Sequence, residues 1–193
     1  MPRRNAALVL DQALLYVRNN CTQETACAAE ATTAYEGVDP AVWAPTTPYS
    51  LGAAVRPVAR NNFVYEATVG GTSGGTQPTF PTTPGATVVD GGVTWTCRTN
   101  HVVAVATMAP GDFTVAAGLS GGNTPRRLIV AARTGTPIVR NGTADHVALV
   151  RPGSATVPPE LFYVTVSTPQ ALTAGGTVTI PTFDAEIRAV GAP

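Results

Sequence analysis

Turn-forming residues interrupt this chain so often that long helices have little room. Its 193 residues include 19 glycines, 17 prolines and 29 threonines. Beyond residue 101, turn residues separate strand-length apolar segments at intervals of about 10–18 residues. Short strands at this spacing are typical of antiparallel sandwiches and jelly rolls. The sequence therefore predicts a mainly β fold, an antiparallel β-sandwich or jelly-roll-like domain.

The expected strands of this domain are Val102–Met108, Phe113–Ala116, Leu128–Arg133, His146–Val150, Phe162–Val166, Thr177–Ile180 and Phe183–Ile187. Turns are expected at Pro110-Gly111-Asp112, Gly121-Gly122-Asn123, Asn141-Gly142, Pro152-Gly153 and Gly175-Gly176. Alternation is poor across Leu128–Ala131, which predicts a strand buried on both faces. One N-terminal helix is expected over residues 5–18, because Asn5 is a suitable N-cap and Leu10, Leu14 and Val17 form an apolar stripe.

Residues 39–98 have a different composition, dense in proline, glycine and threonine. Short strands are expected at Phe63–Ala67, Thr87–Val89 and Val93–Cys97, with Asp90-Gly91-Gly92 as a hairpin turn between the last two. The Gly70–Thr76 run predicts a flexible loop without reactive side chains. We interpret this stretch as a small three-stranded β module inserted into a sandwich made of residues 1–38 and 99–193. Insertion requires the ends of the module, near Pro40 and Arg98, to lie close together.

Charge and hydropathy exclude several classes of protein. Twelve arginines balance twelve acidic residues, the pI is about 6.7, and no basic cluster suited to nucleic acid is present. No apolar run approaches the length of a membrane span. The apolar run Ala6–Leu10 is interrupted by Asp11 and Gln12, so it is not a signal peptide. We therefore expect neither a nucleic-acid partner nor a membrane partner.

Few residues could perform catalysis or bind a metal. His101 and His146 are the only side chains with a neutral-pH base, and neither has metal-ligand spacing or a nearby nucleophile. Asp184 and Glu186 share one strand face, a common solvated pattern. The sequence predicts no enzyme activity, no cofactor and no metal. The three cysteines, Cys21, Cys27 and Cys97, are expected to be reduced, although the first two could pair if a local loop closed.

Four aromatic residues of the middle stretch are the candidate binding residues: Trp43, Tyr49, Tyr65 and Trp95. An exposed ring can stack on the C–H face of a sugar at little entropic cost. Alternatively, a module this small uses its large side chains as its core. The core interpretation is favoured for Tyr65 and Trp95, which lie on strands. Both interpretations stay open for Trp43 and Tyr49.

The pattern W-x5-Y-x2-G-x2-V-x-P, present as Trp43, Tyr49, Gly52, Val55 and Pro57, resembles the small chitin- and cellulose-binding-type modules. Together with the Gly-Thr-Ser-Gly-Gly-Thr-Gln-Pro loop and the Asp-Gly-Gly-Val-Thr-Trp-Thr-Cys ending, it is closer to the version found in bacteriophage virion proteins. The resemblance covers residues 43–98 and implies a three-stranded sheet and glycan binding. The flanks, with Leu-Asp-Gln-Ala-Leu-x-Tyr and Gly-Thr-Ala-Asp-His-Val-Ala-Leu-Val, resemble small β-sandwich structural proteins of tailed phages.

These resemblances imply a virion structural protein that is made in the bacterial cytoplasm. Our leading hypothesis is a capsid decoration (cement) protein, a homo-oligomer that binds the major capsid protein or other virion proteins through its sandwich. Its module would project outward and contact glycans. The alternative is a tail or neck fibre adhesin that binds host polysaccharide. A third hypothesis is a carbohydrate-binding accessory domain of an enzyme. Residues Pro2, Arg3 and Arg4 are either an arm onto a neighbouring subunit or an unstructured terminus.

Overall fold

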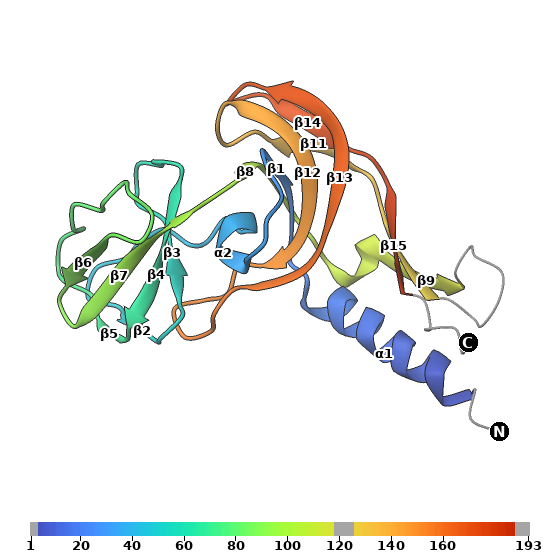
Figure 1. Cartoon of the computed structure of the whole chain (residues 1–193), viewed down its shortest axis with the longest axis horizontal. Coiled ribbons are helices and arrows are strands. Elements are labelled where there is room, and N and C mark those ends of the chain that lie inside the picture. Colours follow the sequence, from blue (N-terminus) through green and yellow to red (C-terminus); the bar gives the residue numbers. More distant parts are fainter. Residues whose placement is uncertain (1–3, 118–125, 188–193) are drawn as a thin grey trace.

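The computed structural model describes residues 4–117 and 126–187, with side chains described from Leu10 onward, and it confirms a mainly β fold with antiparallel sheets. Figure 1 shows two lobes, the residue 39–98 module on the left and the sandwich on the right, with the N-terminal helix below the sandwich. The expected turn at Gly121–Asn123 and the Pro2-Arg3 part of the arm lie outside the described residues.

The largest sheet has four strands in the order β13-β12-β1-β8, and its centre is buried on both faces. Its strands are β1 (Gln23–Cys27), β8 (Val102–Thr107), β12 (Gly142–Arg151) and β13 (Glu160–Leu172). Strand β1 was not expected from the sequence, although it lies inside the sheet between β12 and β8. Its neighbouring residues Glu24 and Thr25 point to opposite faces of the sheet, and both are fully buried. A strand buried on both faces need not alternate polar and apolar residues, so its sequence lacks the usual strand pattern.

Two smaller sheets and a helix-containing segment cover the main sheet. The smaller sheets are β15-β10-β9 and β11-β14. Their strands are β9 (Phe113–Ala117), β10 (Arg126–Val130), β11 (Arg133–Pro137), β14 (Thr177–Ile180) and β15 (Phe183–Ile187). On one face, Ala26 and Leu149 of the main sheet belong to the clusters that these sheets close. On the opposite face, Cys27 and Ala148 pack beneath Val38.

The expected N-terminal helix is present as α1 (Arg4–Asn20), which buries Leu14 against β9 and β10. An ion pair between Asp11 and Arg126 also joins α1 to β10. Two short helices were not expected: the single turn α2 (Ala34–Gly37) and the 3-10 turn η1 (Pro110–Asp112). In the part of the chain that the structure describes, no helix has the length and apolar character that crossing a bilayer requires.

Several strand expectations of the sandwich need correction. Thr177–Ile180 and Phe183–Ile187 are confirmed, whereas the expected Leu128–Arg133 strand ends at Val130 and Arg133 already begins β11. The expectation that β10 is buried on both faces is wrong. Leu128 and Val130 are fully buried, but Ile129 between them is only partly buried. The small sheet packs against the core only with the face that carries Leu128 and Val130.

The module holds more strands than the three expected. A four-stranded sheet has the order β3-β4-β7-β6, and a two-stranded pair joins β2 to β5. Their bounds are β2 (Pro48–Tyr49), β3 (Ala54–Val55), β4 (Phe63–Val69), β5 (Gly71–Thr72), β6 (Thr87–Asp90) and β7 (Val93–Thr99). The expected hairpin is confirmed: Asp90 pairs with Val93, and Gly91 has φ +61°.

The expected flexible loop at Gly70–Thr76 is instead held by hydrogen bonds. Gly71 and Thr72 form β5, and the Ser73 hydroxyl is buried and donates to the carbonyl of Ala44 at 2.8 Å. A side chain at Gly71 would meet the carbonyl oxygen of Gly92 at 2.4 Å. Glycine is therefore needed there for close backbone approach rather than for flexibility.

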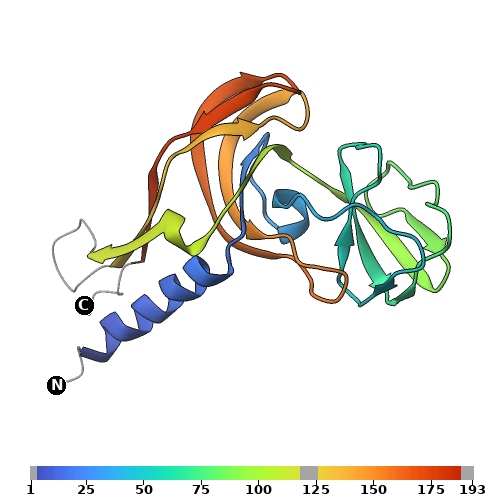
Figure 2. The ribbon, with the colours of Figure 1, turned by 180° about the vertical axis from the view of Figure 1, so that it is seen from behind.

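The module has a hydrophobic cluster of its own, and its two connections to the sandwich are bonded to each other. The Asn100 side-chain amide donates to the carbonyls of Tyr35 at 3.0 Å and Val38 at 2.8 Å. A third link comes from the loop between β12 and β13, where the Ala155 carbonyl accepts from the Ser50 backbone N–H at 2.8 Å. Figure 2 shows both connecting segments entering the module beside α2. The module is thus fixed to the sandwich at several points.

Candidate functional site

The structure brings together all four aromatic residues proposed for glycan stacking. The rings of Tyr49 and Trp95 meet edge to face with centroids 4.9 Å apart. Tyr65 stacks on Phe80 at 4.1 Å, and Phe80 reaches Trp95 at 6.3 Å. Trp43 belongs to the same cluster, which contains no residue of the sandwich core.

Asp90 is the polar centre of this cluster. Its Oδ2 accepts the indole N–H of Trp43 at 2.8 Å and that of Trp95 at 3.0 Å. Its Oδ1 accepts the backbone N–H of Gly74 at 2.8 Å, and only 5% of the residue is exposed. One buried carboxylate therefore joins three parts of the module: the segment around Trp43, the loop that contains Gly74, and the β6–β7 hairpin. From the sequence Asp90 was expected only as a turn residue, because its bond to Trp43 joins positions 47 residues apart.

The tyrosine hydroxyls are also used inside the module. The Tyr65 hydroxyl donates to the Pro81 carbonyl at 2.7 Å and accepts from the Asn61 amide at 2.6 Å. Burial raises the pKa of Tyr65 to about 12. The Tyr49 hydroxyl accepts the backbone N–H of Ala44 at 3.0 Å. Each ring is therefore held at both its apolar face and its polar end.

Burial of these rings corrects the glycan-stacking expectation for all four residues. Tyr65 and Trp95 are 0% exposed, Tyr49 is 6% exposed and Trp43 is 7% exposed. A sugar can stack only on a ring face that reaches solvent, and no more than 7% of any of these residues does. The rings form the core of the module, which was the second interpretation of the sequence.

The surfaces that do reach solvent lie elsewhere, and one of them is a cleft between α2 and the module. Tyr35, Glu66 and Arg98 line this cleft of about 420 Å³. The Arg98 guanidinium donates to Glu66 at 2.7 Å, and the Tyr35 hydroxyl donates to the Gly52 carbonyl at 3.0 Å. Burial and the nearby Glu66 raise the pKa of Tyr35 to about 12. These polar groups therefore already bond within the chain. The bond from Tyr35 joins α2 to the module, and the bond between Arg98 and Glu66 lies inside the module.

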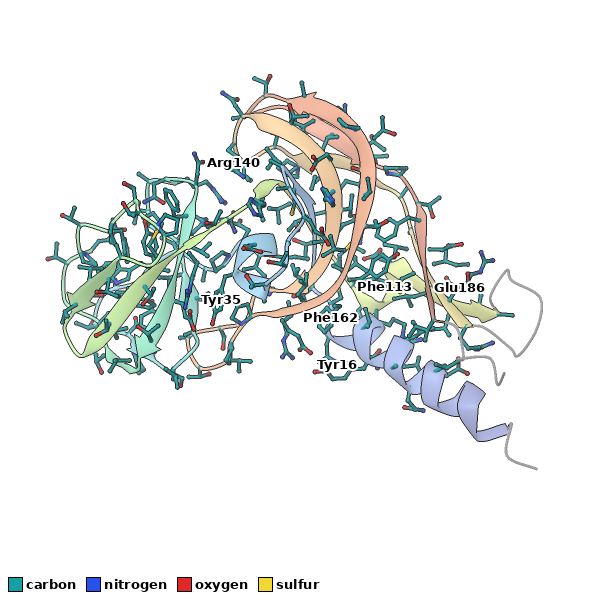
Figure 3. All side chains as sticks on the ribbon, viewed as in Figure 1. Tyr16, Tyr35, Phe113, Arg140, Phe162 and Glu186 are labelled. Carbon is teal, nitrogen blue, oxygen red and sulfur yellow. The ribbon has the colours of Figure 1, made fainter. Side chains whose placement is uncertain are left out.

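A cluster of arginines occupies the opposite side of the junction. The Asp39 carboxylate accepts two hydrogen bonds from Arg60, at 2.6 and 2.7 Å, and Arg56 lies 3.3 Å from the same carboxylate. Arg140 donates to the backbone carbonyls of Val102 at 2.5 Å and Asn100 at 3.1 Å. Figure 3 shows Arg140 and Tyr35 at the notch between the lobes. This cluster fastens the connecting segments.

An apolar groove of about 330 Å³ opens on the sandwich between β13 and β14. Val147, Leu172 and Ile180 are among the apolar residues that line it, and each is less than 9% exposed. Exposed polar residues, including Gln170 and Thr179, contribute to the lining. The groove has room for an apolar side chain, and its lining offers hydrogen bonds to a surrounding chain. Its chemistry therefore suits a protein segment.

Two of the residues considered for catalysis, His146 and Asp184, are engaged in local contacts. The His146 ring nitrogen Nδ1 lies 2.7 Å from the Asp145 carboxylate, and the backbone of His101 bonds Glu36 and Ala28. Asp184 pairs with Arg127 at 2.6 Å. Residues 4–117 and 126–187 contain no group of three or more histidine, cysteine or acidic side chains that could hold a metal.

The three cysteines are free and buried. Cys21, Cys27 and Cys97 belong to three different hydrophobic clusters, so no two of them pack in the same one. Burial raises the pKa of the Cys21 thiol to about 12 and that of Cys27 to about 11. These thiols are therefore poor nucleophiles.

Glu24 is the one buried carboxylate that sequence reasoning did not single out. It is 0% exposed on the central strand β1, and neither carboxylate oxygen has a hydrogen-bond partner. Burial raises its pKa to about 7, while the nearby Arg133 lowers it. Arg133 is itself ion-paired with Asp112. No pattern in the sequence distinguishes Glu24 from a surface glutamate.

Comparisons with protein-family models, with curated proteins and with solved structures find no match to this chain.

Proposed function

We propose that this chain is a structural protein of a bacteriophage virion, a capsid decoration protein that binds the capsid lattice and projects its module outward. In this proposal it acts by adhesion, without enzyme activity, and assembles on the virion after synthesis in the bacterial cytoplasm. The free, buried thiols suit a protein made in a reducing compartment. The burial of the module's aromatic rings removes glycan binding at those four residues from the proposal.

The observation that carries the proposal is the division of hydrophobic core between two lobes that are fixed to each other. The module packs around Trp95 and Asp90, while the sandwich packs around separate clusters that are mainly aliphatic. The Asn100 bonds and the Ala155 link hold the module in place. Such a shape lets one lobe bind a surface while the other projects from it, and a repeated lattice multiplies a weak contact through avidity.

We assign the lattice contact to the apolar groove between β13 and β14. Its floor is apolar and its lining includes polar residues, as expected for a site that receives a side chain of a protein partner. The test is binding of the purified protein to capsids from which it has been removed. Thr179→Arg places a charge at the groove without changing a buried residue, and we expect it to abolish binding. Thr87→Arg, an exposed threonine on strand β6 of the module, is the matched control.

The number of copies in purified phage particles tests the position in the virion. Quantitative gel densitometry should give on the order of hundreds of copies for a protein that covers a capsid lattice. On the order of ten copies would instead place the chain in the neck or tail, as the adhesin alternative requires. Absence of the chain from particles would overturn the virion proposal altogether.

A further inference from the structure

The longest strand of the molecule, β13, lies at an edge of the main sheet. It has 13 residues and pairs only with β12 among the described strands. The other edge of the same sheet is closed: Ala104 of β8 bridges to Ile138, and the Val103 carbonyl accepts the backbone N–H of Val139 at 2.8 Å. The outer edge of β13 therefore offers backbone hydrogen-bonding groups that no described strand uses.

The usual protection of an edge strand is weak in the middle of β13, from Tyr163 to Val166. Natural edge strands avoid pairing with other chains through charged side chains, prolines or bulges. From Leu161 to Ala171 there is no charged residue, and Val166 is 74% exposed. The charged residue at the start of the strand, Glu160, is neutralised by Arg151 of β12 at 2.7 Å.

Irregularities in the pairing with β12 divide β13 into segments. Leu149 pairs with Tyr163 whereas Val150 pairs with Leu161, so a bulge lies at Phe162. A second irregularity, containing Pro169, lies between Val166 and Gln170. Figure 3 shows Phe162 beside Tyr16 of α1, and their ring centroids are 6.0 Å apart. The end of β13 near Glu160 is therefore covered by the helix, and the open part is the segment from Tyr163 to Ser167, of which Tyr163 to Val166 pairs regularly with β12.

We propose that a second copy of this chain pairs with β13 through this segment, in antiparallel register about a two-fold axis at Thr165. Side chains that face each other across an antiparallel pair lie on the same face of the sheet. This register places Thr165 opposite its counterpart, Val164 opposite Val166, and Tyr163 opposite Ser167. Threonine pairs and pairs of β-branched residues stabilise neighbouring strands.

The charges of the strand are compatible with this register. The segment from Tyr163 to Ser167 carries no charged residue, so no two like charges are opposed. The two exposed valines at position 166 become covered, and the two main sheets join into one continuous sheet. A second copy supplies the same chemistry on both sides of the contact, as a two-fold interface requires. The inference goes beyond the proposed virion role and does not depend on it.

The dimer should be weak in solution. A contact of five residues along a strand edge is much smaller than the ~800 Å² per partner of a standard interface. We therefore expect a monomer at low concentration and a rising fraction of dimer as the concentration of the purified chain increases.

Sedimentation equilibrium of the purified full chain tests the interface. Val166→Lys places an ammonium group against Val164 of the second copy, and we expect the dissociation constant to rise about tenfold or more. Val89→Lys is the matched control, because Val89 is a valine on an edge strand of the module and is 71% exposed, close to the 74% of Val166. Equal weakening by both variants would overturn the proposal, as would a wild-type chain that stays monomeric at the highest soluble concentration.

Disulfide trapping tests the register independently of any effect of lysine on folding. Thr165→Cys places two thiols opposite each other on the two-fold axis, and mild oxidation should give a covalent dimer on a non-reducing gel. The natural cysteines are all buried, so they contribute little background. Val89→Cys is the control and should stay monomeric. Equal cross-linking of both variants would indicate random collision and overturn the assigned register. Because phage particles are not involved, failure here is distinguishable from failure of the virion proposal.

Discussion

The module and the sandwich each bury one carboxylate, and the two carboxylates have opposite surroundings. Asp90 in the module accepts three N–H donors, two of them from indole rings. Glu24 in the sandwich has no hydrogen-bond partner at either oxygen. A buried carboxylate stabilises a fold when its bonds replace those lost to water, and it destabilises the fold otherwise. Asp90 is therefore expected to organise its lobe, whereas Glu24 is expected to weaken the lobe that contains it.

The two lobes also differ in the size of the side chains that fill them. The module is built from few residues and buries the rings of Trp43, Tyr49, Tyr65, Phe80 and Trp95. The sandwich is larger and relies on aliphatic residues such as Leu128, Leu149 and Val130. A small lobe has little interior, so a few large rings must supply most of the apolar area that it buries. The same rings are then unavailable for a ligand.

The largest expected effect comes from removing the centre of the module. Asp90→Ala leaves two buried indole N–H groups without an acceptor, and we expect it to lower the free energy of unfolding by about 3–5 kcal/mol. Both tryptophans of the chain lie in the module. Urea unfolding followed by tryptophan fluorescence therefore reports on this lobe. Asp90→Asn retains an acceptor and should lose about half as much. An Asp90→Ala variant as stable as the wild type would contradict the role assigned to this carboxylate.

A second substitution tests which face of β10 contributes to the sandwich core. Leu128 is fully buried, so Leu128→Ala should cost about 2–5 kcal/mol. Ile129, its neighbour in the strand, is only partly buried and should cost about 1 kcal/mol when changed to alanine. Unfolding in urea monitored by far-ultraviolet circular dichroism measures both. Equal losses would mean that β10 is buried on both faces after all.

The third prediction concerns the pH dependence that Glu24 gives to the sandwich. Its pKa is about 7 in the fold and close to 4.5 when unfolded. The folded protein therefore binds the proton more tightly, and its stability falls as the pH rises from about 4.5 to 7. The total loss is about 3 kcal/mol. Arg133, which is paired with Asp112, is the charged group that opposes this shift.

Glu24→Gln isolates this contribution, because glutamine keeps the shape and does not titrate. The difference in unfolding free energy between variant and wild type should be more favourable to the variant at pH 8 than at pH 5. Denaturant titrations at the two pH values measure it. A difference that does not change with pH would show that Glu24 is not protonated preferentially in the fold.

The hairpin and the helix illustrate what local pattern can predict. The Asp90-Gly91-Gly92 turn and the apolar stripe of α1 depend on residues within a few positions of one another, and both were predicted correctly. Strand β1 was missed because its burial on both faces comes from layers that lie far away in the sequence. The end of β10 at Val130 was missed because a continuous run of apolar residues carries no mark of where a strand changes sheet.

The candidate binding residues show the same limit. The sequence favoured a core role for Tyr65 and Trp95, and it left open whether Trp43 and Tyr49 belong to a core or to a binding surface. Trp43 and Asp90 are 47 positions apart, so no local pattern could reveal their bond. The open edge of β13 was equally hidden, because an edge strand and a central strand can have the same sequence.

The sequence by itself determined the mainly β class, the N-terminal helix, the Asp90-Gly91-Gly92 turn and the change of composition across residues 39–98. These features depend on backbone preferences and short-range periodicity, which each segment carries with it. Only the tertiary structure decided which faces are covered: the rings of Trp43 and Trp95 turn inward, Glu24 is enclosed, and β13 is left with a free edge. Burial is a property of the neighbours that surround a residue, and those neighbours come from distant parts of the chain.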